Sequence, residues 1–244
     1  MTHNLVIIPT YNERDNITPL ITDILKLPNE FDILLIDDNS PDGTSECIQA
    51  FQLDSPLGSR VHLLKRPGKM GLGSAYRDGY QWALERNYAI ICQMDADFSH
   101  QPATLAQFVR EVDQVDFVLG SRYVPGGHTV GWPWYRLWLS RLANLYARYA
   151  TGYQIYDLTG GFKCFKRRVI SSLVSLPIKA DGYAFQIETT VYALINGYKA
   201  KEIPITFTER EKGKSKLSKH VIWEAIFSVL KLAANTKSTD AKSE

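Results

Sequence analysis

The stretch Ala89-Ile-Ile-Cys-Gln-Met-Asp-Ala-Asp97 joins a mostly apolar run directly to two carboxylates. A short apolar run bounded by polar residues is typical of a buried strand in a parallel sheet. In open α/β sheets, ligands bind in the crevice beyond the carboxyl ends of the strands. The stretch therefore predicts a doubly wound sheet with an acidic site at its edge.

Apolar runs of this kind alternate with amphipathic stretches throughout the first half of the chain. This alternation predicts an α/β fold with a Rossmann-like, mostly parallel sheet flanked by helices. The other strands are expected at 5–8, 33–36, 61–64 and 117–119, and the helices at about 13–26, 43–53, 71–86 and 102–113.

The second half of the chain is less regular and ends in amphipathic helical patterns. A length of 244 residues suits one large domain. We therefore expect a single catalytic domain over 1–234, with halves 1–122 and 123–234, and a flexible tail at 235–244. Its elements are expected as helices at about 133–150, from 166, at 184–196 and at 217–234, strands at 161–165 and 199–207, and a charged loop at 209–216.

The composition is that of a soluble globular protein, with 45% hydrophobic and 22% charged residues. Three cysteines without C-x-x-C spacing indicate a reducing compartment. No apolar run approaches the roughly 18 residues that a membrane span requires. Residues 1–5 also lack the features of a signal peptide. We therefore expect a cytoplasmic protein.

The two halves of the chain differ in charge. Residues 1–122 contain 10 Lys and Arg against 17 Asp and Glu, whereas residues 123–244 contain 18 against 9. An acidic half suits a divalent cation and the nucleotide that it accompanies, and a basic half suits phosphate groups or an anionic membrane surface. We expect no nucleic-acid partner.

The acidic pair Asp95 and Asp97 follows its strand directly. Alternation at a strand end brings both carboxylates within reach of one hard cation, and Mg²⁺ or Mn²⁺ is the expected cofactor. Helix capping before Pro102 is the alternative interpretation. Asp38, also at a strand end, suits the donor groups of a nucleotide base or ribose. The chain contains neither G-x-G-x-x-G after the first strand nor a P-loop, which disfavours a dehydrogenase or a P-loop ATPase.

Seven motifs in order resemble those of dolichol-phosphate mannose synthases, which are family 2 glycosyltransferases of GT-A fold. The resemblance covers residues 9–217, and its last three motifs are characteristic of polyprenyl-phosphate glycosyltransferases. The motifs are Pro9-Thr-Tyr-Asn-Glu13, Asp37-Asp-Asn-Ser-Pro-Asp-Gly-Thr44, Asp95-Ala-Asp97, Gly120-Ser-Arg-Tyr123, Asp157-Leu-Thr-Gly-Gly-Phe162, Gly182-Tyr-Ala-Phe-Gln-Ile-Glu188 and Gly213-Lys-Ser-Lys-Leu217.

The resemblance implies a role for each matching residue. Asp95, Asp97, Arg122 and Arg210 are the implied catalytic residues. Ser99 stands where some members place a glutamine as a third metal ligand, so it is the third candidate ligand beside Asp95 and Asp97. The implied nucleotide-sugar site comprises Pro9, Tyr11, Glu13, Ile36, Asp38, Asp95, Ala96, Asp97, Arg122, Arg210 and Lys216.

The implied reaction transfers mannose from GDP-mannose to dolichyl or another polyprenyl monophosphate, with inversion. A phosphate acceptor already carries about −1.5 to −2 charge near neutral pH, so the reaction needs no general base. Arg136 and Arg141 are the candidates for the acceptor phosphate. The alternatives are a polyprenyl-phosphate transferase that uses a UDP-sugar such as UDP-glucose, and a non-catalytic scaffold subunit.

The expected helix at 134–150 is amphipathic, with an arc of Trp, Tyr and Leu on one side and Arg, Ser and Asn on the other. Either this arc packs on the sheet, or it lies at a membrane surface where Trp, Tyr and Arg meet the headgroups. We expect the second, with peripheral attachment to the cytosolic face of a membrane. Trp223 and Phe227 on the final helix suit a second contact or a small anchoring subunit.

Overall fold

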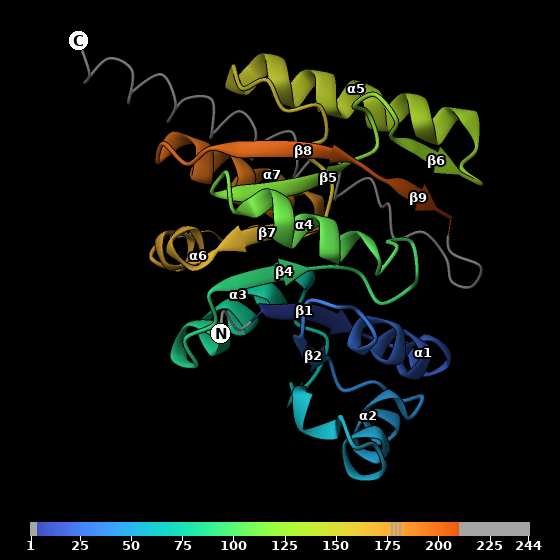
Figure 1. The fold of residues 1–244 in the computed structure, drawn as a ribbon. Helices are drawn as coiled ribbons and strands as arrows, with labels where there is room; N and C mark the ends of the chain where they lie inside the picture. The colour runs from blue at the N-terminus through green and yellow to red at the C-terminus, as the bar shows by residue number, and fades with distance from the viewer. Residues whose placement is uncertain (1–3, 177, 179, 181, 210–244) are drawn as a thin grey trace.

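The computed structural model describes residues 4–176, 178, 180 and 182–209. Within these residues, seven strands form one sheet in the order β3-β2-β1-β4-β7-β5-β8, and β6 pairs with β9 beside it (Figure 1). The strands are β1 (Asn4–Thr10), β2 (Phe31–Asp37), β3 (Val61–Lys65), β4 (Ile90–Gln93), β5 (Phe117–Ser121), β6 (His128–Val130), β7 (Lys163–Lys166), β8 (Ala200–Pro204) and β9 (Thr206–Thr208).

The sheet is mostly parallel, as expected. β1 pairs in parallel with β2 and β4, β2 with β3, and β5 with β8. Only β7 is antiparallel among these strands, and it lies between β4 and β5. The apolar pattern of β7 predicts a strand but not whether that strand runs parallel or antiparallel to its neighbours. The path of the chain between β5 and β7 determines the direction.

Helices cover both faces of the sheet, which explains why its strands are continuously apolar. Leu5 and Ile7 of β1 face a core built with α3, α6 and α7, whereas Val6 and Ile8 face a core built with α1, α2 and α4. These helices are α1 (Arg14–Leu25), α2 (Thr44–Asp54), α3 (Leu72–Glu85), α4 (Thr104–Val112), α6 (Arg167–Val174) and α7 (Gly182–Ile195).

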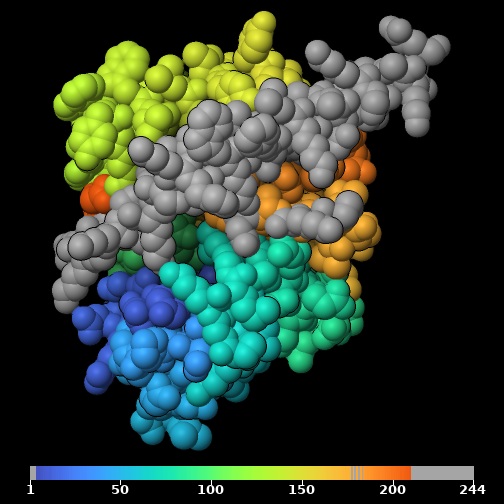
Figure 2. Space-filling view, turned by 180° about the vertical axis from the view of Figure 1, so that it is seen from behind, coloured from blue at the N-terminus to red at the C-terminus, as the bar shows by residue number. Residues whose placement is uncertain are grey.

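Helix α5 (Trp134–Thr151) lies beyond the β8 edge of the sheet, at the top of Figure 1. It ends at Gly152, whose left-handed φ of 77° terminates the last turn. The space-filling view from behind also shows it at the opposite end of the molecule from β3 and α2 (Figure 2). Within the part of the chain that the structure describes, the helix therefore forms one end.

An amphipathic helix usually buries its apolar side, but α5 exposes most of its aromatic side and buries part of its polar side. Trp134 is 75% exposed and Tyr149 is 90% exposed, whereas Asn144 and Ala147 are buried. The interpretation in which the whole aromatic arc packs on the sheet is therefore wrong; within the arc, Tyr146 alone contacts the core. The exposed members are Trp134, Tyr135, Trp138, Leu139, Leu142, Leu145 and Tyr149, which we call the aromatic face.

One expectation for the second half differs from the structure, and several others lie outside the described residues. The strand expected at 199–207 is divided at Ile205 into β8 and β9, because Ile205 N bonds to Ser121 O while Thr206 pairs with His128 of β6. The loop beyond residue 209, the helix at 217–234 and the tail lie outside the described residues, as do Trp223 and Phe227. Among the described residues, no helix combines the length and hydrophobicity needed to cross a membrane.

Candidate active site

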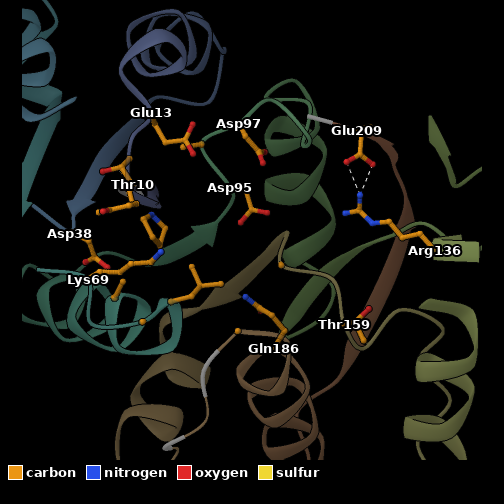
Figure 3. A pocket seen from close by; sticks show the side chains of 18 residues that line it. Thr10, Glu13, Asp38, Lys69, Asp95, Asp97, Arg136, Thr159, Gln186 and Glu209 are labelled. Atoms are coloured by element: carbon orange, nitrogen blue, oxygen red, sulfur yellow. Dashed lines mark hydrogen bonds and ion pairs between the residues drawn. The ribbon is translucent and has the colours of Figure 1, made fainter. Parts of the chain in front are cut away.

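A pocket of about 300 Å³ opens beyond the carboxyl ends of β1, β2 and β4. Figure 3 shows its acidic residues and Arg136 facing the same space. Residues from both halves of the chain surround it, so the two oppositely charged halves meet here. The lining is Pro9, Thr10, Tyr11, Glu13, Asp38, Lys69, Gly71, Leu72, Ala75, Asp95, Ala96, Asp97, Arg136, Thr159, Gly161, Gly182, Gln186 and Glu209.

The neighbouring carboxylates Asp37 and Asp38 have different roles. Asp37 is almost fully buried and accepts hydrogen bonds from the Thr10, Ser40 and Ser45 hydroxyls at 3.1, 2.6 and 2.7 Å, so it fixes the turn after β2. Asp38 lines the pocket, as expected. Because successive side chains of an extended chain point to opposite sides, only one of the pair reaches the ligand space.

Arg66 holds Asp38 in place, and sequence reasoning did not find it. Its Nε and Nη2 lie 2.6 and 2.5 Å from Asp38 Oδ1, in a position where Arg66 is only 6% exposed. Arg66 also donates to the Ser74 hydroxyl and to Gly71 O. This charge-assisted cluster orients Asp38 and anchors the loop before α3.

That loop places a second missed residue in the pocket. The ammonium nitrogen of Lys69 lies 4.6 Å from the centre of the Tyr11 ring. Both residues line the pocket together with Asp38, so an aromatic ring and a cationic side chain lie side by side there. A single lysine in the segment Pro67-Gly-Lys-Met-Gly71 has no sequence pattern that marks it as a ligand.

Asp95 and Asp97 line the pocket just after β4, as expected. Two hydrogen bonds hold the loop that carries these carboxylates. Ser99 N donates to Asp97 Oδ1 at 3.1 Å, and Asp95 N donates to His100 Nδ1 at 3.2 Å. His100 is buried against Phe162, with ring centres 4.7 Å apart. Burial lowers the pKa of His100 more than the surrounding carboxylates raise it, which suits a neutral imidazole accepting this bond.

The donor set fits a hard divalent cation held jointly with a nucleotide. Among the described residues, no group of three or more His, Cys, Asp or Glu side chains is arranged to hold a metal. In proteins, Mg²⁺ is usually bound by one or two carboxylates, and substrate phosphate oxygens and water supply the remaining ligands. The third predicted ligand, Ser99, is buried and does not line the pocket, and its hydroxyl has no hydrogen-bond partner in the described part of the chain.

Arg122, expected at the nucleotide sugar, does not line the pocket but lies buried behind it. Its Nε and Nη2 bind the two oxygens of Asp157 at 2.7 and 2.6 Å, and Nη2 also donates to Thr159 Oγ1 at 2.8 Å. Burial raises the pKa of Asp157, but Arg122 outweighs this effect and holds the pKa below its ordinary value. Arg122 therefore positions Thr159, which does line the pocket.

The two candidates for the acceptor phosphate are placed differently. Arg136 lines the pocket, whereas Arg141 is exposed and has its guanidinium 5.9 Å from the centre of the Tyr123 ring. Ile36 is fully buried in the core and contributes no side chain to the lining. Arg210 and Lys216 lie outside the described residues. Of the other residues predicted for the nucleotide sugar, the pocket lining includes Pro9, Tyr11, Glu13, Asp38, Asp95, Ala96 and Asp97.

A buried polar network is attached to two residues of the pocket lining, Gly161 and Gln186. Gln93 Nε2 donates to Gly161 O at 2.9 Å and to Gln186 Oε1 at 2.7 Å, and the Tyr80 hydroxyl donates to Gln93 Oε1. Gln93 lies within an apolar strand and Gln186 within an apolar helix. A polar residue at such a buried position is the sequence signal that could have identified this network.

Comparison with known proteins identifies the family of this chain. Residues 5–174 match the family described as Glycosyl transferase family 2, and the chain belongs to it. It is 45% identical over 226 residues to a polyprenol monophosphomannose synthase from Mycolicibacterium smegmatis, which covers 92% of this chain and 84% of that protein. It is 38% identical over 240 residues to an undecaprenyl-phosphate mannosyltransferase from Micrococcus luteus, which covers 98% of both chains.

Solved structures confirm the GT-A type of fold. A glucosyl-3-phosphoglycerate synthase from Mycobacterium tuberculosis, in complex with Mn²⁺, UDP and glucosyl-3-phosphoglycerate, matches with a TM-score of 0.68 and 17% identity, over 96% of this chain and 80% of that one. A mannosyltransferase from Pyrobaculum calidifontis, in complex with GDP-Man and Mn²⁺, matches with a TM-score of 0.59 and 19% identity, over 99% of this chain and 76% of that one.

Proposed function

We propose that this protein transfers mannose from GDP-mannose to a polyprenyl monophosphate, releasing GDP. The observation that carries the proposal is one pocket in which Asp95 and Asp97 face the guanidinium of Arg136. A nucleoside diphosphate needs the acidic, metal-binding side, and a second phosphate needs the basic side. The two mannosyltransferase relatives named above support mannose and a polyprenyl phosphate as the substrates.

Asp95 and Asp97 would hold Mg²⁺ or Mn²⁺, with Ala96 between them beside the diphosphate. Such a cation neutralises charge that accumulates on a departing diphosphate. Mn²⁺ accompanies the nucleotide in both structural neighbours described above. In this chain Ser99 N donates to the Asp97 carboxylate, and the backbone nitrogen of Asp95 donates to His100 Nδ1, so hydrogen bonds hold the loop that carries both aspartates.

The nucleoside would occupy the side of the pocket formed by Tyr11, Glu13 and Asp38. Tyr11 offers a stacking face, and the two carboxylates accept hydrogen bonds from base or ribose groups. Arg210 and Lys216 remain proposed diphosphate ligands on the evidence of their motifs. The acceptor phosphate would reach Arg136, because it is the arginine of α5 that lines the pocket.

Inversion requires only that the acceptor phosphate oxygen attack the anomeric carbon from the side opposite the leaving GDP. A phosphate dianion is already deprotonated, so the chain contributes position and charge rather than a general base. A lipid acceptor also requires a membrane contact. The aromatic face of α5 would lie at the cytosolic surface of a membrane, with peripheral attachment.

The test is transfer of radiolabelled mannose from GDP-mannose into lipid that partitions into organic solvent. The purified full chain is supplied with polyprenyl phosphate in detergent and with Mg²⁺ or Mn²⁺. We expect labelled, acid-labile lipid, its loss with a chelator, and its absence when the alcohol replaces the phosphate. Labelling from UDP-glucose in place of GDP-mannose would overturn the donor assignment, and no labelling from either would indicate a scaffold.

A further inference from the structure

We propose that Gln186 recognises the transferred sugar, through a hydrogen bond from its side-chain amide nitrogen to a hydroxyl oxygen of the hexose. The proposal rests on the proposed sugar transfer. It names a residue that binds the sugar rather than the nucleotide. Among the described residues, Gln186 Nε2 has no hydrogen-bond partner, although the residue is only 3% exposed. A buried amide donor without a partner is unfavourable unless a ligand accepts its hydrogen bond.

The hydrogen-bond network determines which end of the Gln186 amide faces the pocket. Gly161 O can only accept, so Gln93 must present its amide nitrogen there, and the second hydrogen of that nitrogen goes to Gln186 Oε1. Burial raises the pKa of Tyr80, which therefore stays protonated and donates to Gln93 Oε1. The Gln186 oxygen is thus occupied, and its nitrogen is the end that points into the pocket (Figure 3).

Gly161 keeps the space beside this nitrogen open. A Cβ built on Gly161 would lie 3.4 Å from Gln186 Nε2 and 3.7 Å from Asp95 Oδ1. The same small space is therefore bordered by a free donor on one side and by a proposed metal ligand on the other. Any side chain at position 161 would occupy this space.

The position of Gln186 along the pocket suits the sugar rather than either phosphate. In Figure 3, it lies between Asp38 and Lys69 on one side and Thr159 and Arg136 on the other. The transferred hexose must lie between the nucleotide and the acceptor phosphate, since its anomeric carbon bonds to one and is attacked by the other. A hexose presents hydroxyl oxygens that accept an amide hydrogen bond.

The backbone that holds Gln186 is itself anchored. The buried side-chain nitrogen of Lys163 donates to Gln186 O at 2.7 Å, and the Thr190 hydroxyl donates to the same oxygen at 3.0 Å. Backbone and side chain are therefore both held before substrate binds, which is the arrangement that recognition of a small polar group requires.

The test compares binding of GDP-mannose and of GDP by calorimetry, with Mn²⁺, in the parent and in Gln186→Leu. We expect the affinity for GDP-mannose to fall about three- to tenfold, as loss of one hydrogen bond predicts, and the affinity for GDP to stay within about twofold. Gln81→Leu, an exposed glutamine on α3, is the matched control and should change neither. Gly161→Ala should show the same selective loss by filling the space.

Equal weakening of GDP-mannose and GDP in Gln186→Leu, or no weakening of either in both variants, would overturn the proposal. Unchanged GDP binding also reports that each variant is folded. Failure of this proposal can be told apart from failure of the proposed function. If the parent binds a UDP-sugar instead of GDP-mannose, the mannose assignment has failed. The same comparison, made between that UDP-sugar and UDP, then still tests Gln186.

Discussion

Arg136 Nη1 lies 2.6 and 2.5 Å from the two carboxylate oxygens of Glu209, and both residues line the pocket. The pair connects α5 to the residue that follows β9. The guanidinium also lies 4.2 Å from the centre of the Trp132 ring. The arginine assigned to the acceptor phosphate is thus already paired with a carboxylate, and an incoming phosphate has to displace that carboxylate or share the guanidinium with it.

Replacing Glu209 with glutamine should strengthen binding of the acceptor. The variant removes a competing charge but retains the size of the side chain, so we expect the KM for polyprenyl phosphate to fall about threefold or more, with little change in the KM for GDP-mannose. Steady-state transfer kinetics with each substrate varied measure both constants. Glu30→Gln, at an exposed site before β2, is the control; a higher acceptor KM in Glu209→Gln would show that Glu209 assists the acceptor.

Asp97→Ala should reduce mannose transfer below a tenth of the parent rate even at saturating metal. Its carboxylate faces the pocket rather than the core, so removing it weakens cation binding and leaves the fold intact. Transfer assays across a Mn²⁺ titration, with thermal unfolding beside them, provide the measurement. A variant that exceeds a tenth of the parent rate with an unchanged melting temperature would refute the metal assignment.

Asp157→Asn should destabilise the protein by about 3–5 kcal/mol, because it leaves the buried Arg122 without its counter-charge. Urea unfolding at neutral pH measures this loss. The exposed Asp23→Asn, which removes one partner of a surface pair with Lys26, should cost less than about 1 kcal/mol. Similar losses in the two variants would contradict a structural role for Arg122.

The same pair predicts an acid dependence. The pKa of Asp157 is lower in the folded protein than in the unfolded chain, so its contribution to stability is complete above the ordinary value of 3.8 and is lost as the pH falls through the lowered one. The parent should therefore lose stability relative to Asp157→Asn below about pH 4. Parallel stability curves between pH 5 and pH 2 would exclude this linkage.

Lys163→Met should change how stability depends on alkaline pH. Burial lowers the pKa of Lys163 to about 7 from 10.5, so between these values the unfolded chain binds the extra proton and the parent becomes more stable as the pH rises. The variant should lack this gain, whereas Lys26→Met, at an exposed site, should keep it. Urea unfolding at pH 6.5, 8 and 9.5 gives the comparison, and a persisting gain in Lys163→Met would count against a buried, titrating lysine.

The double variant Trp134→Ser/Trp138→Ser should stop flotation with anionic liposomes without lowering the melting temperature. Both side chains are largely exposed, at 75% and 59%, so the fold does not depend on them. Binding by the parent should weaken as salt is added. Leu53→Ser/Leu57→Ser removes exposed leucines within and just after α2, which lies at the opposite end from α5 (Figure 1), and should float like the parent. Failure of the parent to float would show that the lipid is reached another way.

Much of the fold was readable from local patterns. The strands β1 to β5 and helices α1 to α4 lie within a few residues of their expected positions, because burial on both faces requires continuous apolar runs and because each helix has its own periodicity. The same logic located Asp38, Asp95 and Asp97, since the carboxyl ends of parallel strands share one edge of a sheet.

The sequence by itself determined that Asp95 and Asp97 end a buried strand and that α5 has one aromatic side; tertiary structure decided where each of these features points. The aromatic face of α5 lies outward because Asn144 finds partners inside, where it bonds to the hydroxyl and backbone nitrogen of Thr159. Arg122 does not line the pocket because its guanidinium is paired with the buried Asp157. Such pairings join residues distant in sequence, so they depend on how the chain connects its strands, and no local pattern of polarity contains that information.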